Sequence, residues 1–294
     1  MRFTVFTPTY NRGYIIEQLY RSLQRQTFKD FEWVVVDDGS LDNTPALFEM
    51  FQAENNSFPI VYVRTENGGK HRAINKGIQI AHGELFYIVD SDDYLLDSAL
   101  ELMNNIEQTI PMEKKSTFCG ICGIRANENK QFIGKTFDGD TLDITMLERE
   151  KHGITGDKAE AFYTDVLKQY QFPEFEEEKF LTECVVWDKI AYDGYKLRFF
   201  NEITMICEYR KDGLTAAGDS LFVKNPKGWG LYLYQCYRFR KIHGINKWLK
   251  YLEYYYALRD KHSFSKIAKN LHYPVFQFRI RLFFLKLFCK FYDR

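Results

Sequence analysis

The first hundred residues alternate between strand and helix patterns, and this alternation limits the folds available to the chain. Apolar, β-branched runs predict buried strands, and the amphipathic segments between them predict helices. The predicted strands are 2–7, 31–38, 60–65 and 84–90, and the predicted helices are 14–26, 44–55 and 69–83. Strands joined by helices of this length form right-handed βαβ units, so we expect a parallel sheet.

Polar clusters follow all four predicted strands directly. They read TPTYNR at 7–12, DDGSLDN at 37–43, TENGGKHR at 65–72 and DSDD at 90–93. In sheets of this kind, ligands bind beyond the carboxyl ends of the strands. We therefore expect the four clusters to share one binding site.

The DSDD cluster places Asp90, Asp92 and Asp93 within four positions. Neighbouring carboxylates repel one another, and a cation favours their ionised state. Oxygen ligands suit Mg²⁺, Mn²⁺ or Ca²⁺. The plainer alternative is a solvated acidic turn that caps the next helix.

Two other acidic motifs fit the cluster poorly. An EF-hand loop would need glycine at its sixth position, where Leu95 stands. A phosphatase with an Asp nucleophile would carry its D-x-D after the first strand, whereas this one follows the fourth. Metal-assisted binding of a diphosphate remains, in which substrate oxygens complete the coordination of the ion.

Three stretches resemble a known family in order and spacing. They are FTPTYNR, QTFKDFEWVVVDDGSLDNT and NGGKHRAINKGIQIAHGELFYIVDSDD. They resemble the nucleotide-sugar-binding half of inverting family 2 glycosyltransferases. The resemblance is specific over residues 3 to about 100 and looser from 115 to 215. It implies the GT-A fold, an α/β architecture whose Rossmann-like mixed sheet is flanked by helices.

The resemblance implies positions for the nucleotide. The loop after the first strand would border the base, through Thr7, Pro8, Thr9, Tyr10 and Arg12. The second acid of VVVDDGS, Asp38, would accept a hydrogen bond from a uracil N–H, and an ionised acceptor strengthens such a bond. Taken alone, Asp37 and Asp38 fit an ordinary turn after a strand.

The resemblance also implies positions for the diphosphate and its metal. Asn67, Gly68, Gly69 and Lys70 would lie along the nucleotide, with Lys70 as the cation for phosphate. Asp90 would face the ribose or a metal-bound water, next to Ser91. Asp92 would ligate Mn²⁺ or Mg²⁺. No role follows for Asp93.

The catalytic base is where the chain departs from the family pattern. The family commonly uses the Asp of an Glu-Asp pair at the start of a late helix, and no such pair stands in the expected place. Spacing to Trp187 and to EYR at 208–210 favours Glu183, with Thr182 replacing the Glu. Alternatively, Glu178 matches the Glu, and Lys179 replaces the Asp. Each residue alone also fits a solvated acid near a helix start.

The segment 151–162, KHGITGDKAEAF, carries a further candidate. Glycines before a helix make an anion site, so we expect this segment and Lys158 to contact diphosphate or acceptor. His152 would supply a third metal ligand, although a lone surface histidine usually has no such role. Cys119 and Cys122 have C-x-x-C spacing but lack partner ligands, so we interpret them as buried structural thiols.

Beyond residue 115 we expect paired strands at 116–126 and 130–137 and helices at 157–170 and 179–191. A last strand at 202–210 ends in KDGLT. The expected division is a GT-A domain at 1–227, with a nucleotide-sugar half at 1–115 and an acceptor half at 116–227. A helical tail would follow at 228–294.

The chain is neutral overall, but its charge is unevenly distributed. Residues 228–294 hold fourteen Lys and Arg against three acids, so the tail carries +11 and the remainder −11. Lys and Arg interleave there with Phe, Leu, Trp and Tyr, as in helices that lie on anionic membranes. A packed helical subdomain and a face for single-stranded nucleic acid are the alternatives. We expect a membrane partner and no nucleic acid.

These observations favour a metal-dependent inverting glycosyltransferase. The donor would be a nucleotide-diphosphate sugar, with UDP favoured, and the acceptor a polysaccharide or lipid-linked glycan. The resemblance implies bacterial surface-polysaccharide synthesis. No signal peptide pattern opens the chain and no run reaches about 18 apolar residues, so we expect a cytoplasmic protein peripheral to the inner face of the membrane. The alternatives are an inactive nucleotide-sugar-binding module and a nucleotidyltransferase.

Overall fold

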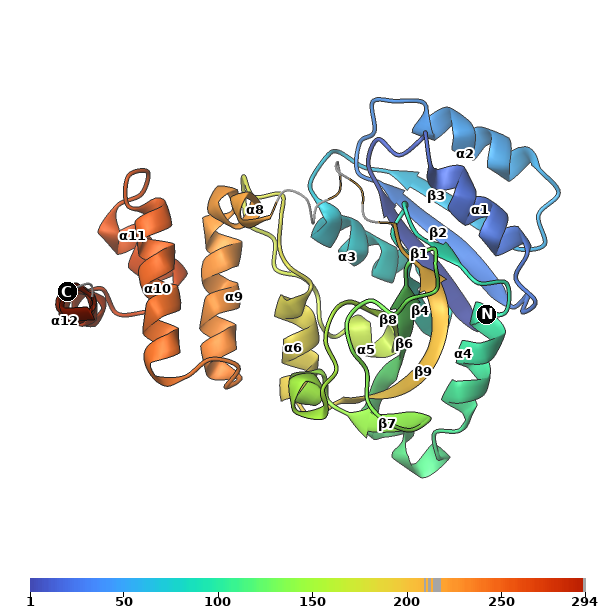
Figure 1. Cartoon of the computed structure of the whole chain (residues 1–294). Helices are drawn as coiled ribbons and strands as arrows, with labels where there is room; N and C mark the ends of the chain where they lie inside the picture. Colours follow the sequence, from blue (N-terminus) through green and yellow to red (C-terminus); the bar gives the residue numbers. More distant parts are fainter. Residues whose placement is uncertain (209, 211–212, 214–217, 293–294) are drawn as a thin grey trace. The chain divides into compact units, whose positions relative to one another are not determined.

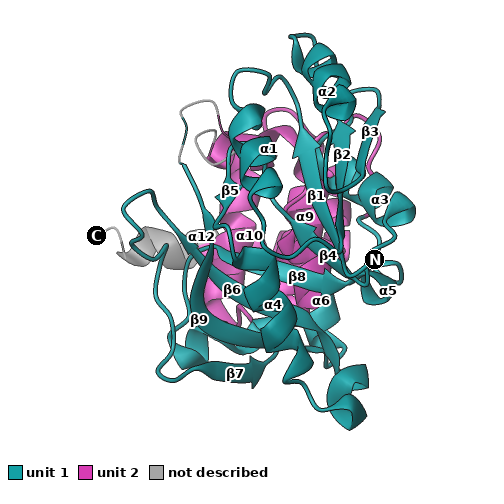
Figure 2. Ribbon diagram, turned by 90° about the vertical axis from the view of Figure 1, so that its right-hand side faces the viewer, with its two compact units in different colours: residues 1–172, 190–210 teal, residues 173–189, 211–294 magenta. Residues whose placement is uncertain are grey.

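A computed structural model describes residues 1–208, 210, 213 and 218–292, with side chains up to residue 285. Of the segment KDGLT expected after the last strand, all residues but Gly213 lie outside the described residues. The described part divides into two compact units, coloured separately in Figure 2. Unit 1 comprises Met1–Phe172 and Ile190–Arg210, and unit 2 comprises Pro173–Lys189 and Lys211–Arg294.

The elements of unit 1 form one mixed sheet with its flanking helices (Figure 1). The strands are β1 (Phe3–Thr9), β2 (Phe31–Asp37), β3 (Ile60–Arg64), β4 (Leu85–Ile88), β5 (Tyr94–Leu95), β6 (Phe118–Ala126), β7 (Thr141–Ile144), β8 (Lys158–Tyr163) and β9 (Lys196–Ile206). The helices are α1 (Ile16–Gln24), α2 (Thr44–Ala53), α3 (Lys70–Ile80), α4 (Ala99–Gln108) and α5 (Thr164–Leu167), with 3-10 turns η1 (Met112–Thr117) and η2 (Met146–His152). The helix α6 (Cys184–Tyr192) joins the two units.

The nine-stranded sheet runs in the order β3-β2-β1-β4-β8-β6-β9-β5, and β7 pairs with β9. The first four strands in this order are parallel, as the sequence predicts. β8 pairs antiparallel with both β4 and β6, and β6 pairs parallel with β9. The expected GT-A mixed sheet is therefore confirmed.

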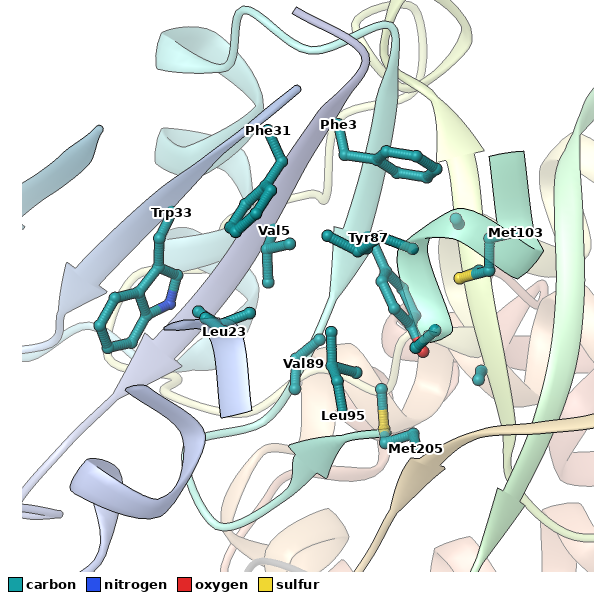
Figure 3. Close-up of a cluster of buried hydrophobic side chains, with 14 of the residues drawn as sticks. Phe3, Val5, Leu23, Phe31, Trp33, Tyr87, Val89, Leu95, Met103 and Met205 are labelled. Carbon is teal, nitrogen blue, oxygen red and sulfur yellow. The ribbon is translucent and has the colours of Figure 1, made fainter. Parts of the chain in front are cut away.

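Helices cover both faces of the parallel strands. Phe3 and Val5 of β1 belong to a core cluster with Leu23 of α1 and Met103 of α4, part of which Figure 3 shows. The neighbouring Phe6 points to the other face, where α3 lies. A side chain at Gly77 of α3 would come within 2.2 Å of the Phe6 ring. Because successive strand residues face opposite ways, a buried strand between two helical layers is apolar throughout.

The sequence predictions fail mainly after residue 126. Segment 157–170 was expected to be a helix, but residues 158–163 form β8, and only α5 is helical. Gly120 of β6 allows β8 to come close, since a Cβ there would lie 2.0 Å from the Ala161 carbonyl oxygen. Segment 130–137 forms no named strand and contributes one isolated bridge, Ala126 to Phe132. The expected pairing of 116–126 with 130–137 is thus limited to this bridge, because the main partners of β6 are β8 and β9.

Unit 2 contains the helical tail that the sequence predicts. Its helices are α8 (Asp219–Lys224), α9 (Pro226–Arg238), α10 (Gly244–Leu258), α11 (Phe264–Asn270) and α12 (Val275–Tyr292). No helix in the described part of the chain is long and apolar enough to cross a membrane. The predicted division at residue 228 does not coincide with the compact units, because 173–189 joins the tail. Lys241 pairs with Asp188 at 2.7 Å, and the Asn225 side chain accepts a hydrogen bond from the Lys179 N–H at 2.8 Å.

The C-x-x-C cysteines are buried free thiols. Cys119 and Cys122 form no disulfide and lie in β6. Burial raises the pKa of both thiols far above the ordinary value. The two residues are structural, as expected, because a buried thiol that resists ionisation is neither a nucleophile nor a metal ligand.

Candidate active site

The polar clusters that follow β1, β2 and β4 meet at one edge of the sheet. The Asp38 N–H donates to the Thr9 carbonyl at 2.8 Å, so the loops after β1 and β2 start side by side. On the other side of β1, the Val89 N–H donates to the Phe6 carbonyl at 2.9 Å. The shared edge predicted from the sequence is present.

Asp38 ties the next loop to the end of β2. Its carboxylate accepts from the backbone N–H groups of Gly68 at 2.6 Å and Gly69 at 2.8 Å, and from the Asn67 amide at 3.1 Å. Gly69 precedes α3 with φ of 99°, a conformation that favours glycine. Asp38 was expected to bind uracil, and the structure gives it the additional role of fixing the start of α3.

Lys70 and Asp90 form the central ion pair of the site. The Lys70 Nζ lies 2.7 Å from an Asp90 oxygen, and both side chains are about one quarter exposed. Burial opposes ionisation of Asp90, but Lys70 and Arg125 together hold its pKa below the ordinary value. Asp90 is therefore ionised at neutral pH, and the first residue of α3 presents a cation at a helix N-terminus.

Asp92 has the properties of a metal ligand. Burial, and then the charge of Asp90, raise the pKa of Asp92. None of the residues that the structure describes donates a hydrogen bond to its side chain except through its own backbone. A divalent cation would neutralise this carboxylate, so Asp92 fits the ion that the sequence predicts.

His152 does not complete a metal site. The described residues include no group of three His, Cys, Asp or Glu side chains that could hold an ion. His152 is exposed in η2. The structure therefore does not support the expected role of His152 as a third metal ligand. An ion on Asp92 would need oxygens from the diphosphate or from water.

Lys158 is also not available to a phosphate. The segment before it leads into β8 and not into a helix, so it has no helix N-terminus to offer. The Lys158 side chain is buried and donates to the carbonyls of Ile133 at 2.9 Å and Thr155 at 2.5 Å. It fixes the surrounding loops, and the expected contact with diphosphate is wrong.

Arg125 is a residue of the site that the sequence analysis missed. It lies near the end of β6, with its Nε donating to the Lys158 carbonyl at 2.7 Å. One terminal nitrogen lies 3.6 Å from Asp93 and 4.0 Å from Asp90. The sequence signal that could have identified Arg125 is its position directly after the apolar run GICGI.

Asp93 anchors the acidic loop through buried contacts. It is almost fully buried, faces Arg125 and accepts from the Cys207 thiol at 3.2 Å. Burial raises the pKa of Asp93 to about 7, with Asp90 adding to the shift and Arg125 opposing it. Asp93, to which the sequence assigned no role, therefore positions the segment that carries Asp92.

We expect Arg125→Met to lower the free energy of unfolding by about 3 kcal/mol, because it leaves buried carboxylates without their cation. Lys114→Met, at an exposed position, is the matched control and should change little. Urea unfolding measures both. Adding Asp93→Asn to Arg125→Met should recover part of the loss. An Arg125→Met protein as stable as wild type would show that the guanidinium does not hold the loop.

The residues after β1 differ in accessibility. Thr7 is buried and accepts from the Trp33 indole at 3.0 Å, and Pro8 is buried beside it, so these two support the loop. Tyr10 is 44% exposed, and the Arg12 side chain donates to the Tyr14 hydroxyl at 3.1 Å. The charge of Arg12 favours ionisation of Asp90 and Asp92, which places it electrostatically within the site.

The two candidate bases have different surroundings within unit 2. Glu178 is 5% exposed, and its oxygens accept from the backbone N–H groups of Lys227 at 2.7 Å and Gly228 at 2.8 Å. It therefore caps the N-terminus of α9. Glu183 is half-buried and directly precedes α6, where its carbonyl accepts from the Val186 and Trp187 N–H groups. The capping role of Glu178 favours Glu183 as the base.

The sequence is similar to those of known proteins. Residues 4–109 match the family model described as Glycosyl transferase family 2. A curated relative from Campylobacter jejuni, GalNAc(5)-diNAcBac-PP-undecaprenol beta-1,3-glucosyltransferase, is 28% identical over 63% of this chain and 58% of its own length. The poly(ribitol-phosphate) beta-N-acetylglucosaminyltransferase TarS of Staphylococcus aureus is 38% identical over 34% of this chain and 18% of its own. The chain thus spans less than two thirds of these relatives.

Solved structures share the fold over most of the chain. TarS residues 1–349 in complex with UDP-GlcNAc superpose with a TM-score of 0.64 at 21% identity, over 89% of this chain and 73% of that one. The mannosyltransferase PcManGT of Pyrobaculum calidifontis, solved with GDP-Man and Mn²⁺, gives 0.57 at 20% identity, over 88% and 72%. The mixed sheet and these neighbours show the GT-A fold. Residues 4–109 carry the family 2 glycosyl transferase pattern, so the resemblance seen in the sequence is confirmed for that part of the chain.

Proposed function

We propose that the protein is an inverting, metal-dependent glycosyltransferase. It moves a sugar from a nucleotide-diphosphate donor, with UDP favoured, to a hydroxyl of a polysaccharide or lipid-linked glycan. The observation that carries the proposal is the placement of the Asp92 carboxylate beside the Lys70–Asp90 pair at the N-terminus of α3. A cation, a helix N-terminus and a free carboxylate at one strand edge suit a metal-bound diphosphate.

Several residues would bind the nucleotide. Tyr10 and Arg12 would border the base, and the segment held by Asp38, Asn67 to Gly69, would run along the nucleotide. The Thr9 hydroxyl is buried without a hydrogen-bond partner in the described part of the chain, and a bound donor would supply one. Lys70 would exchange its contact with Asp90 for a phosphate oxygen, and Asp90 would then face the ribose or a metal-bound water beside Ser91.

Asp92 would hold Mn²⁺ or Mg²⁺, with Asp90 near the ion. Such an ion, when bound, stabilises the charge that gathers on a departing diphosphate. Lys70 adds a fixed positive charge to the same region, and Arg125 keeps the acidic loop in place through Asp93. A preset arrangement of this kind stabilises developing charge without reorganisation at the moment of reaction.

Glu183 would take the proton from the acceptor hydroxyl as that oxygen attacks the anomeric carbon. The bond from this carbon to the diphosphate breaks in the same step, so configuration inverts. General bases of this kind contribute about 10²- to 10⁴-fold to rate. The absence of the family's Glu-Asp pair keeps a second candidate open, an inactive nucleotide-sugar-binding module. A nucleotidyltransferase is less suitable, because TPTYNR replaces the Gly- and Arg-rich loop such an enzyme would carry after β1.

The biological setting is bacterial surface glycan synthesis, such as capsule, O-antigen or exopolysaccharide. The names of the curated relatives support this setting, since one acts on an undecaprenol-linked glycan and another on poly(ribitol-phosphate). Lipid-linked acceptors lie at the inner face of the cell membrane. The proposed location of the protein is therefore that face, with residues 228–294 in contact with it.

Nucleotide binding tests the proposal. UDP with Mn²⁺ should raise the melting temperature of the full chain, since a ligand that binds only the folded state stabilises it. The shift should fall when Mn²⁺ is replaced by EDTA, and GDP and ADP should give smaller shifts. Equal shifts with and without the metal would contradict the metal-dependent part, and no shift with any nucleotide would contradict donor binding.

A further inference from the structure

The helix α12 is apolar on two opposite sides. Its inner side, Phe278, Leu282 and Leu285, belongs to the buried core of unit 2. The outer side carries four large apolar residues at helical spacing, which we call the outer stripe. Its members are 75%, 42%, 61% and 63% exposed, and they are Phe276, Ile280, Phe283 and Phe284. A contiguous exposed apolar surface of this kind marks an interaction site, so something should cover the outer stripe.

The surroundings of the outer stripe are positively charged. Arg279 and Arg281 lie beside it and are exposed. Residues 261–292 contain seven Lys and Arg and no Asp or Glu. Within the described residues, no carboxylate forms an ion pair with either arginine. The partner that covers the stripe should therefore combine apolar surface with negative charge.

Lys247 adds a second, independent observation on the same side of unit 2. Its side chain is 5% exposed and has no ion pair within the described part of the chain. Its Nζ lies 3.2 Å from the ring centre of Tyr237 and 4.8 Å from that of Trp248. The Arg281 guanidinium lies 5.5 Å from the same Trp248 ring. Two cations without a carboxylate thus lie against one aromatic side chain, which adds positive charge to this side of unit 2.

We propose that α12 lies in the plane of an anionic membrane, with the outer stripe among the acyl chains and Arg279 and Arg281 facing phospholipid headgroup phosphates. Interfacial helices bind in this way, with an aromatic or aliphatic side in the boundary region and cations at the headgroups. The inference rests on the membrane location proposed above and deepens it. It identifies the face of the predicted tail that would meet the bilayer.

Charge argues against other occupants. A second copy of the chain would place the same basic face against itself, since a symmetric dimer brings identical patches together. Single-stranded nucleic acid would satisfy the cations, but it would leave the outer stripe largely in water, because only its bases stack on rings. An anionic bilayer satisfies both the charge and the apolar surface.

The test is co-sedimentation of the full chain with lipid vesicles. Wild type should pellet with vesicles that contain phosphatidylglycerol and much less with pure phosphatidylcholine, and added salt should weaken binding. The double variant Phe283→Ser, Phe284→Ser should lose binding about tenfold or more, since both rings leave the lipid. Arg279→Glu with Arg281→Glu should abolish the preference for anionic lipid. Leu41→Ser with Met50→Ser, two exposed apolar residues of unit 1, is the matched control and should bind as wild type.

Circular dichroism and UDP binding check that each variant is folded and that the site in unit 1 is intact, so that this inference can fail while the proposed function stands. Wild type that does not pellet with anionic vesicles would overturn the inference. So would a wild-type dimer that the Phe283, Phe284 double variant dissociates, because a second copy would then cover the stripe. Displacement from vesicles by single-stranded DNA but not by salt of equal ionic strength would also contradict it.

Discussion

Asp92→Asn should lower the rate of sugar transfer by about 10²-fold or more, because the amide cannot neutralise or hold the divalent ion that stabilises the leaving diphosphate. The structure gives the reason for choosing this acid. Asp90 is already paired with Lys70, and Asp93 is buried against Arg125. Asp92 alone of the three lacks a side-chain partner within the described residues, and burial with the charge of Asp90 raises its pKa, so a bound cation would favour its ionised form.

The measurement is the initial rate at increasing Mn²⁺ concentration. In Asp92→Asn the rate should stay low and the Mn²⁺ concentration at half-maximal rate should rise, while UDP binding without metal stays near wild type. Asp138→Asn, at an exposed acid outside the site, is the control and should leave both quantities unchanged. An Asp92→Asn enzyme with the normal rate and metal dependence would remove Asp92 from the metal site.

Glu183→Gln should reduce transfer by about 10²- to 10⁴-fold and leave UDP affinity within about twofold, because a glutamine cannot accept the acceptor's proton. The acceptor hydroxyl is deprotonated only in the transition state, so binding of the donor should not depend on this residue. Single-turnover rates at saturating donor, together with UDP titration, separate the two effects.

Glu178→Gln is the matched comparison at the rival position. Glu178 caps α9 through the N–H groups of Lys227 and Gly228, so the change should destabilise unit 2 by about 1 kcal/mol. Folded Glu178→Gln enzyme should turn over at near the wild-type rate. If Glu178→Gln loses activity and Glu183→Gln does not, the base assignment is reversed.

Patterns local in sequence predicted the first half of the fold. The strands that became β1 to β4 are continuous apolar runs, and each ends in a polar cluster that the parallel arrangement brings to one edge. The Lys70–Asp90 contact follows from that arrangement. Lys70 comes after β3 and Asp90 comes after β4, and the carboxyl ends of these parallel strands lie at the same edge of the sheet. Asp38 was assigned to this edge, although its bonds to the 67–69 loop depend on loop geometry that a sequence pattern does not carry.

The second half depends on contacts between segments distant in sequence. The sequence KAEAFY favours a helix, because Lys, Ala and Glu have high helix propensity. In the fold it forms the strand β8, which pairs with β4 on one side and β6 on the other and has small residues at Ala159 and Ala161. Arg125 meets Asp93 only because β6 is placed near β4 by that inserted strand. The capping role of Glu178 likewise requires α9, which begins 48 positions later at Pro226.

Turnover of the donor tests the central claim most directly. The full chain is incubated with Mn²⁺ and each of a panel of UDP-, GDP- and other nucleotide sugars, with and without lipid-linked glycan acceptors, and the released nucleoside diphosphate is measured. We expect release from at least one UDP-sugar, stimulated by an acceptor and lost in Asp92→Asn. Tight UDP binding without release from any donor would contradict the enzyme and leave a nucleotide-sugar-binding module.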